Sequence, residues 1–248
     1  MDFKGRTAII TGAASGMGEA TAREFAEAGA HVVVVDIDAE GAERVASEIG
    51  ASPAVVGDVG NSEFCRAAVA AAVERHGRLD ILVNAAGIIV RAPGETTKDT
   101  QWRRIMSTNL DGVFFMCREA VKRMKAQGRG AIVNFGSIWG DVGAAGVAAY
   151  CATKGGVHQL TRAMALDHVK DGIRINAVCP GEVDTPMLRS ERQRPPSADD
   201  MKKIADTVPM GRLARPVEIA KVVLFLASDD ASYMTGAMVT VDAGFTAR

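Results

Sequence analysis

Short apolar runs alternate with longer segments of helical periodicity from one end of this 248-residue chain to the other. Apolar runs bounded by turn residues predict buried strands, and they occupy residues 7–10, 31–35, 53–57, 79–83, 131–135, 173–178 and 237–241. Buried strands that alternate with helices are typical of a parallel sheet with helices on both faces. We therefore expect one α/β domain over residues 1–248, with a doubly wound, seven-stranded parallel sheet.

The spacing of apolar residues between these strands also predicts helices. One apolar stripe consists of Ala42, Val45, Ala46 and Ile49, and a second consists of Phe64, Ala67, Ala68, Ala71 and Ala72. A helix that begins at Pro216 is apolar on nearly every side, which predicts that it is buried. Residues 181–212 differ, because four prolines should interrupt any regular element there: Pro186, Pro195, Pro196 and Pro209. We expect this segment to be a flap over a site.

Charge and composition narrow the range of partners. The net charge of −1 argues against a nucleic-acid surface, so a small molecule is the expected partner. The chain contains neither a run of eighteen apolar residues nor the features of a signal peptide, and we expect a cytosolic protein without a membrane span. The four cysteines lack C-x-x-C spacing and the four histidines are dispersed, so neither a metal site nor a disulfide framework is expected.

The segment "TGAASGMGEA", residues 11–20, follows the first predicted strand directly. Its three glycines, Gly12, Gly16 and Gly18, would let the backbone turn tightly and approach a pyrophosphate, with Ser15 and Met17 beside it. The helix that begins here would direct its amide groups and the positive end of its dipole at the same charge. A glycine-rich turn without a ligand is the alternative interpretation.

Asp36 at the end of the second predicted strand favours the dinucleotide interpretation. A carboxylate at that position can accept hydrogen bonds from the adenosine ribose hydroxyls. The same charge would repel a 2′-phosphate by roughly 4 kcal/mol, about a thousandfold in affinity, in a partly screened site. Neither Ser15 nor Ile37 supplies a cation to offset that repulsion, so the sequence predicts NAD rather than NADP as the cofactor.

Tyr150 and Lys154 lie at positions i and i+4, which places them on one face of a helix. A free tyrosine has a pKa of about 10, too high for a general base at neutral pH. An ammonium group nearby favours the phenolate, as does a positively charged nicotinamide, and both would lower that pKa. We predict that Tyr150 exchanges a proton with an alcohol or carbonyl oxygen and that Lys154 lowers the pKa of Tyr150.

The order of these motifs resembles that of the short-chain dehydrogenase/reductase family over essentially the whole chain. The matching elements are Thr11-Gly12-x-x-x-Gly16-x-Gly18, Asp58-Val59, Asn84-Ala85-Ala86-Gly87, Asn109, Ser137, Tyr150-x-x-x-Lys154, Pro180-Gly181 and Thr185. The resemblance implies a Rossmann fold and hydride transfer by NAD. It also implies an assembly of four identical subunits, paired through the helices near 105–126 and 150–169.

The resemblance further assigns roles to individual residues. Ser137 would hydrogen-bond the reacting oxygen, and Lys154 would hold the nicotinamide ribose. Asn109 would bend its helix and hold a water linked to Lys154. Asp58 and Val59 would hold the adenine, and Thr185 would bind the carboxamide of the nicotinamide. The remaining cofactor contacts implied by the family are Asn84, Ala85, Ala86, Gly87, Pro180, Gly181 and Val183.

By family position, the substrate would contact Arg91, Ile138, Trp139, Glu182, Arg189 and Arg192. If Arg189 or Arg192 turns inward, a guanidinium would favour an anionic substrate such as a small hydroxy acid or sulfonate; otherwise these charges are a solvated surface. Trp139 could stack on a substrate or pack in the core.

The predicted function is NAD-dependent hydride transfer to and from a small polar secondary alcohol or ketone, such as a polyol, hydroxy acid, hydroxysulfonate or sugar. The alternative within the enzyme class is a 3-oxoacyl-thioester reductase with an acyl-carrier protein as partner, which a basic patch beside the cleft would favour. A non-catalytic dinucleotide sensor is the alternative from another class, since a fold alone does not prove catalysis.

Overall fold

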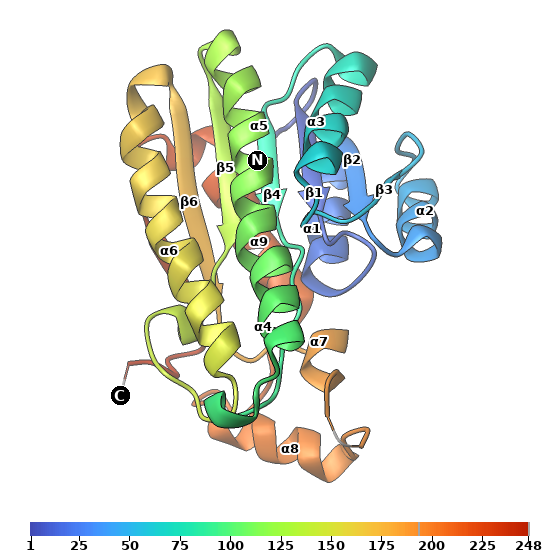
Figure 1. Cartoon of the computed structure of the whole chain (residues 1–248). Coiled ribbons are helices and arrows are strands. Elements are labelled where there is room, and N and C mark those ends of the chain that lie inside the picture. The colour runs from blue at the N-terminus through green and yellow to red at the C-terminus, as the bar shows by residue number, and fades with distance from the viewer. Residues whose placement is uncertain (193, 248) are drawn as a thin grey trace.

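The computed structural model describes residues 1–192 and 194–247, so positions 193 and 248 of the predicted domain and flap lie outside the described residues. A parallel sheet runs through the middle of the molecule in the strand order β3-β2-β1-β4-β5-β6-β7 (Figure 1). Its strands are β1 Thr7–Thr11, β2 His31–Asp36, β3 Val55–Val56, β4 Ile81–Asn84, β5 Gly130–Phe135, β6 Ile173–Pro180 and β7 Met238–Val241. The predicted doubly wound, seven-stranded sheet is confirmed.

Helices cover both faces of the sheet (Figure 1). One face carries α1 Gly16–Glu27, α2 Ala39–Glu48 and α9 Pro216–Ala227. The other carries α3 Ser62–His76, α5 Gly112–Gln127 and α6 Ala148–His168, with α4 Asp99–Met106 leading into α5 through the π-helical turn Ser107–Asp111. Short 3₁₀ helices occupy Gly94–Thr96, Ile138–Gly140, Val169–Asp171 and Asp229–Ala231.

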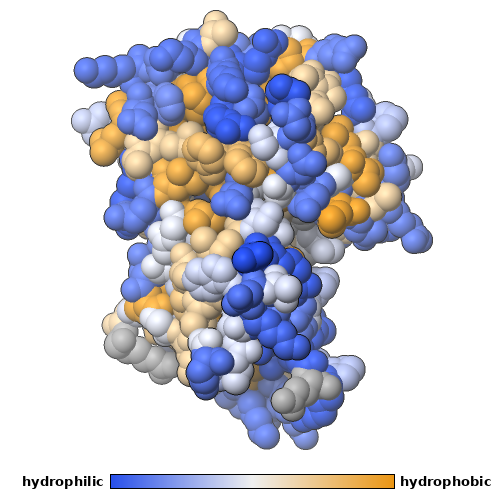
Figure 2. Space-filling view, in the orientation of Figure 1, coloured by the Kyte–Doolittle hydropathy of each residue, from blue (hydrophilic) through white to orange (hydrophobic). Residues whose placement is uncertain are grey.

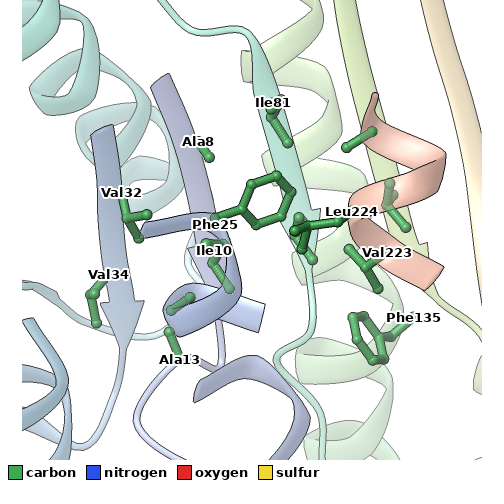
Figure 3. Close-up of a cluster of buried hydrophobic side chains, with 14 of the residues drawn as sticks. Ala8, Ile10, Ala13, Phe25, Val32, Val34, Ile81, Phe135, Val223 and Leu224 are labelled. Atoms are coloured by element: carbon green, nitrogen blue, oxygen red, sulfur yellow. The ribbon is translucent and has the colours of Figure 1, made fainter. Parts of the chain in front are cut away.

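The core between α1, α9 and the sheet fixes the position of the glycine turn (Figure 3). Phe25 of α1 is fully buried and packs edge-on against Phe3, with ring centroids 4.9 Å apart. Val223 and Leu224 of α9 lie on the same side, as the apolar pattern after Pro216 predicts. Burial of each such side chain contributes about 1.5–3 kcal/mol, so α1 is firmly held against the strands that precede and follow it.

Two details differ from the predictions. The buried face of α3 consists of Cys65, Ala68, Val69 and Ala72, whereas Ala67 is exposed, so the predicted stripe is rotated on the helix. The prediction that prolines interrupt every element in 181–212 was wrong, because α7 Pro186–Arg189 and α8 Ala198–Thr207 lie there. Pro186 occupies the first turn of α7, where a missing N–H costs nothing, and α8 lies between Pro196 and Pro209. In the described residues, no helix is both long and apolar enough to cross a membrane.

Candidate active site

Two adjoining cavities open at the carboxyl ends of the strands. The larger cavity, of about 560 Å³, lies over the glycine turn and is bounded by Asp36, Asp58 and the segment 85–89. The smaller pocket, of about 220 Å³, contains Ser137 and Tyr150. The two share walls formed by Met17, Ile89, Thr185 and Met187. In open α/β sheets, ligands bind at this edge, so the position of both cavities is the one expected of a cofactor and its substrate.

The glycine turn forms a close-fitting floor for the larger cavity. Gly12 has a φ of +67°, and a Cβ there would lie 2.7 Å from the backbone nitrogen of Ala86. A Cβ on Gly18 would lie 2.0 Å from the carbonyl oxygen of Gly12. Helix α1 begins at Gly16, and the side chain of Ser15 at its N-cap makes no capping bond within the described chain. The first amides of α1 are therefore available to an anion, and these residues fit a pyrophosphate group.

Asp36 is held rigidly beside this floor. Its two carboxylate oxygens accept hydrogen bonds from the backbone nitrogens of Ala14, at 2.9 Å, and Asp38, at 3.0 Å. Arg44 donates to the carbonyl oxygen of Ala14 at 3.0 Å, but its charge is paired with Glu19 at 3.1 Å. Ser15 and Ile37 line the cavity as predicted, whereas Arg44 lies outside its lining. The Asp36 carboxylate beside the predicted ribose site is thus fixed in place, and the neighbouring guanidinium of Arg44 is neutralised by Glu19.

The segment after β4 forms the opposite wall, and its backbone is positioned by Thr11. The Thr11 hydroxyl oxygen accepts hydrogen bonds from the backbone nitrogens of Ala85 and Ala86, both at 3.1 Å. Ala85, Ala86 and Gly87 line the cavity, in agreement with their predicted place. Asn84 instead points into the interior, where its amide donates to Asn134 Oδ1 at 2.9 Å. This side chain therefore makes a structural contact, and the contact of Asn84 with the cofactor stays a prediction.

Asp58, Val59 and Thr185 also line the larger cavity, with Asp58 accepting a hydrogen bond from the backbone nitrogen of Gly60 at 2.8 Å. Three further predicted cofactor residues line the smaller pocket instead: Pro180, Gly181 and Val183. Sequence reasoning missed several residues of the larger cavity, and no motif marks them: Ile89, Arg104, Thr108 and Glu191.

Ser137 and Tyr150 meet in the smaller pocket. Tyr150 is 9% exposed, and burial raises its pKa to about 12, while a hydrogen bond with Ser137 acts in the opposite direction. The Ser137 hydroxyl oxygen accepts a hydrogen bond from the backbone nitrogen of Trp139 at 3.2 Å. Within the chain, burial outweighs the other influences on the phenol, which contrasts with the prediction that Lys154 lowers the pKa of Tyr150.

Lys154 lies under the Tyr150 ring, with its ammonium nitrogen 5.6 Å from the ring centroid. The ammonium donates to the carbonyl oxygen of Phe135 at 2.7 Å. The side chain is 4% exposed, and burial lowers its pKa to about 8. Lys154 is thus a buried group that can gain or lose a proton near neutral pH, next to the phenol.

Asn109 stands in the π-helical turn between α4 and α5 and is fully buried. Its side-chain amide donates to the carbonyl oxygen of Ile88 at 2.8 Å, and its carbonyl accepts from the backbone nitrogen of the same residue at 2.8 Å. It also donates to Thr153 Oγ1 at 3.3 Å. The widened turn lets this side chain bind the wall of the larger cavity and α6 together, as π-bulges at functional sites often do.

Four of the six predicted substrate residues line the smaller pocket: Arg91, Trp139, Glu182 and Arg192. Burial raises the pKa of Glu182, while Arg91 and Arg192 lower it. Ile138 is buried away from the pocket, and Arg189 forms an ion pair with Asp184 at 2.6 Å. The sequence left open whether the two flap arginines turn inward; Arg192 lines the pocket, whereas Arg189 does not. Trp139 both lines the pocket and packs edge-on against Phe245, with ring centroids 5.6 Å apart.

A family model described as enoyl-(acyl carrier protein) reductase matches residues 12–246. The chain belongs to the short-chain dehydrogenase/reductase family. It is 43% identical to galactitol 2-dehydrogenase (L-tagatose-forming) of Cereibacter sphaeroides, over 98% of this chain and 95% of the relative. Identity to meso-2,3-butanediol dehydrogenase of Serratia marcescens is 42%, over 100% of this chain and 97% of the relative. These relatives of the short-chain dehydrogenase/reductase family are enzymes named for the oxidation of secondary alcohols.

A solved structure of the same short-chain dehydrogenase/reductase fold is that of 3-ketoacyl-(acyl-carrier-protein) reductase from Brucella melitensis complexed with NADH. It superposes with a TM-score of 0.91 at 39% identity, covering 98% of this chain and 99% of the other. The chain is therefore an oxidoreductase of this family with a Rossmann fold, as the sequence motifs predict.

Proposed function

We propose that this enzyme oxidises a small polar secondary alcohol to a ketone with NAD. One observation carries the proposal: Ser137 and Tyr150 line a pocket of about 220 Å³ that adjoins a cavity with a glycine floor. The names of the galactitol and butanediol dehydrogenase relatives support a diol or polyol as substrate. The pocket volume is that of a compact substrate rather than a long acyl chain.

A nicotinamide dinucleotide, when bound, supplies the hydride acceptor. Gly12, Gly16 and Gly18 would hold its pyrophosphate and Asp36 its adenosine ribose. Tyr150 would take the proton of the substrate hydroxyl at its phenolic oxygen, and the Ser137 hydroxyl would hydrogen-bond the same oxygen as its charge changes. Lys154 would stabilise the phenolate by its charge, and Asn109 would hold α6 and the cavity wall in register.

The preference for NAD rests on Asp36. A fixed carboxylate with its neighbouring Arg44 already paired favours ribose hydroxyls and repels a 2′-phosphate. We expect NAD to bind about a thousandfold more tightly than NADP, corresponding to roughly 4 kcal/mol. Titration of both dinucleotides by fluorescence tests this in the unmodified enzyme and in Asp36→Ala. Equal binding of the two by the unmodified enzyme would contradict the assignment.

The substrate class is tested by following NADH formation with galactitol, meso-2,3-butanediol, small hydroxy acids, hydroxysulfonates and cyclohexanol, each repeated with NADP. A strong NAD-linked rate with one class would support the proposal and identify the class. If none of these alcohols gives NADH although NAD still binds, the result would favour either the acyl-thioester reductase or the sensor.

The acyl-thioester reductase is a second candidate because a basic hollow adjoins the smaller pocket. Its walls include Arg91, Arg192, Arg194 and Lys203, against Glu191 and Asp200. The Brucella melitensis structure, named as a 3-ketoacyl reductase, supports this alternative. Acetoacetyl-coenzyme A with NADH distinguishes the two, since only the reductase would turn over this thioester faster than the small ketones.

We also propose a cytosolic homotetramer and a flap over the site, formed by residues 181–192 and 194–212 of the described chain. Figure 2 shows hydrophobic side chains among hydrophilic ones on the face of α5 and α6. Large apolar side chains are exposed on α4, α5 and α6: Trp102, Phe114 and Leu166. Exposed apolar patches mark interaction surfaces, which supports pairing of these helices between subunits. Light scattering at micromolar concentration tests the oligomeric state, and a monomer would contradict the proposed tetramer.

A further inference from the structure

His158 of α6 lies directly behind Ser137, in a slot made by two glycines. It is 1% exposed and follows Lys154 at i+4. A Cβ on Gly136 would lie 2.5 Å from His158 Nε2, and a Cβ on Gly140 would lie 2.4 Å from Cε1. Any side chain at either glycine would collide with the ring. The segment that carries Ser137 is therefore shaped around this imidazole.

Both nitrogens of the ring have partners. Nδ1 lies 3.1 Å from Asp141 Oδ1, and Nε2 accepts a hydrogen bond from the backbone nitrogen of Ser137 at 3.4 Å. Nε2 also lies 3.3 Å from Cys179 Sγ. A backbone N–H can only donate, and a carboxylate can only accept. The hydrogen bonds are satisfied together only by a neutral ring with its proton on Nδ1.

Asp141, His158 and Cys179 place ligand atoms within 4.8 Å of one another, but hydrogen bonding explains this cluster better than a metal does. Asp141 and Cys179 face different nitrogens of the imidazole, so one ion cannot replace both contacts. Burial raises the pKa of the Cys179 thiol to about 12, so the thiol keeps its proton at neutral pH. The protonated thiol can instead share Nε2 as a weak donor.

We infer that His158, oriented by Asp141, is a positioning residue that fixes the backbone of Ser137 and thereby aims its hydroxyl at the reacting oxygen. This inference rests on the proposed function of Ser137. The serine is held at two points, its backbone nitrogen by His158 and its Oγ by the backbone nitrogen of Trp139. A displacement of about 1 Å in such a group can cost about a hundredfold in rate.

Protonation of the ring would break this arrangement, because Nε2 would become a donor facing the N–H of Ser137. The charged and titratable groups around the ring are Asp141, Arg162, Lys154 and Cys179. Burial lowers the pKa of His158, and Arg162 and Lys154 lower it further, while Asp141 raises it. Since the folded pKa is below the unfolded value of about 6.5, the neutral ring contributes stability that is lost as pH falls below that value.

Three variants test the inference: His158→Leu, which keeps the volume without an acceptor, His158→Gln, which can return an amide oxygen near the position of Nε2, and Asp141→Asn. We expect His158→Leu to lower kcat at least tenfold with meso-2,3-butanediol or galactitol while the Kd for NAD changes less than twofold. His158→Gln should recover to within about threefold of the unmodified enzyme, and Asp141→Asn should lose no more than about threefold, because its side chain is 47% exposed and still accepts.

Nuclear magnetic resonance provides a readout that does not depend on turnover. In the unmodified protein we expect the proton of the His158 ring on Nδ1 at pH 7, and an amide proton of Ser137 that moves upfield in His158→Leu. The melting temperature should fall between pH 7.5 and pH 5.5 by a smaller amount in His158→Gln than in the unmodified protein.

Unchanged kcat in His158→Leu would overturn the inference, as would a ring proton on Nε2. Equal losses of kcat and NAD affinity in both His158 variants would also overturn it, since they indicate a purely structural role. An unmodified enzyme that oxidises none of the alcohols would contradict the proposed function alone, because the position of the ring proton still decides the hydrogen bond to Ser137.

Discussion

The larger cavity and the smaller pocket differ in how they are built. The floor and one wall of the larger cavity are formed by glycines and alanines that follow strands, such as Gly12 and Ala86. The smaller pocket is walled by long side chains from distant segments, including Arg91, Glu182 and Ile204. A cavity of backbone and glycine suits a ligand with a constant chemistry, whereas a pocket of side chains can change with few substitutions. The larger cavity thus has the features that suit a dinucleotide, and the smaller pocket has the side chains that can select a substrate.

The largest expected effect lies in the smaller pocket, at the phenol itself. Tyr150→Phe removes the proton-transfer group while keeping the buried ring, so we expect kcat to fall by about 10²–10⁴. Binding of NAD should remain within about twofold. Stopped-flow rates and fluorescence titration measure the two quantities, and a variant that keeps more than a tenth of the activity would remove Tyr150 from its proposed role.

The floor of the larger cavity should be the next most sensitive. Gly12→Ala places a Cβ 2.7 Å from the Ala86 backbone at a positive φ, so we expect the Kd for NAD to rise at least tenfold and stability to fall by about 1–3 kcal/mol. Gly50→Ala is the matched control, since Gly50 has a φ of +66° but open space around it. It should lose stability without losing affinity. Equal affinities in the two variants would show that the close approach of Gly12 to Ala86 is unimportant.

Arg91 connects the pocket to the flap. Its guanidinium donates to the carbonyl oxygens of Ser190 at 3.1 Å and Leu188 at 3.3 Å. Arg91→Met keeps the apolar stem and removes these bonds, so we expect KM for the alcohol to rise about tenfold, equivalent to about 1.4 kcal/mol. Arg189→Met is the control, because Arg189 pairs with Asp184 outside the pocket, and its KM should change less than twofold. Similar KM values in both variants would argue against the role of Arg91 in holding the flap residues 188–190 against the pocket.

The smallest effect is expected where the flap meets the mouth of the larger cavity. Arg104 and Glu191 form an ion pair at 2.8 Å there, with side chains 52% and 37% exposed. Exposed pairs contribute at most about 1 kcal/mol, so Glu191→Gln should raise the dissociation rate of NAD no more than about fivefold. The difference should disappear in 1 M salt, which screens such a pair. Glu63→Gln, in an exposed pair with Arg66, provides the control and should leave the rate unchanged.

Much of the larger cavity could be predicted because its contributors follow strands directly. Gly12 and Ala86 come after neighbouring strands, so a parallel sheet brings them together whatever the rest of the chain does. Asn84 is an exception, because its side chain turns into the interior although it also lies at the end of a strand. It lies beside Asn134 in the register of β4 and β5, and a buried amide takes the nearest polar partner. The pattern of β4 alone does not reveal that partner.

The smaller pocket could be predicted only in part, for a similar reason. Both flap arginines look alike in sequence, yet Arg192 lines the pocket and Arg189 turns to Asp184. Arg189 is the last residue of α7 and Arg192 lies three residues beyond it, so the end of this short helix separates the directions of the two side chains. The charges of Lys154 and of a nicotinamide predict a lowered pKa for Tyr150. Burial of the phenol, which is a property of the packed site, raises the pKa within the chain.

The sequence by itself determined the strand and helix rhythm, the glycine turn, the carboxylate at Asp36 and the pairing of Tyr150 with Lys154. These features depend on the period of apolar residues, on φ preferences and on spacings of a few residues, all of which can be recognised within a short segment of sequence. Only the tertiary structure decided which way Arg189 and Asn84 point, how burial shifts the pKa of Tyr150, and that His158 stands behind Ser137. Those outcomes depend on groups far apart in the chain, whose contacts form only when the sheet and its helices have packed.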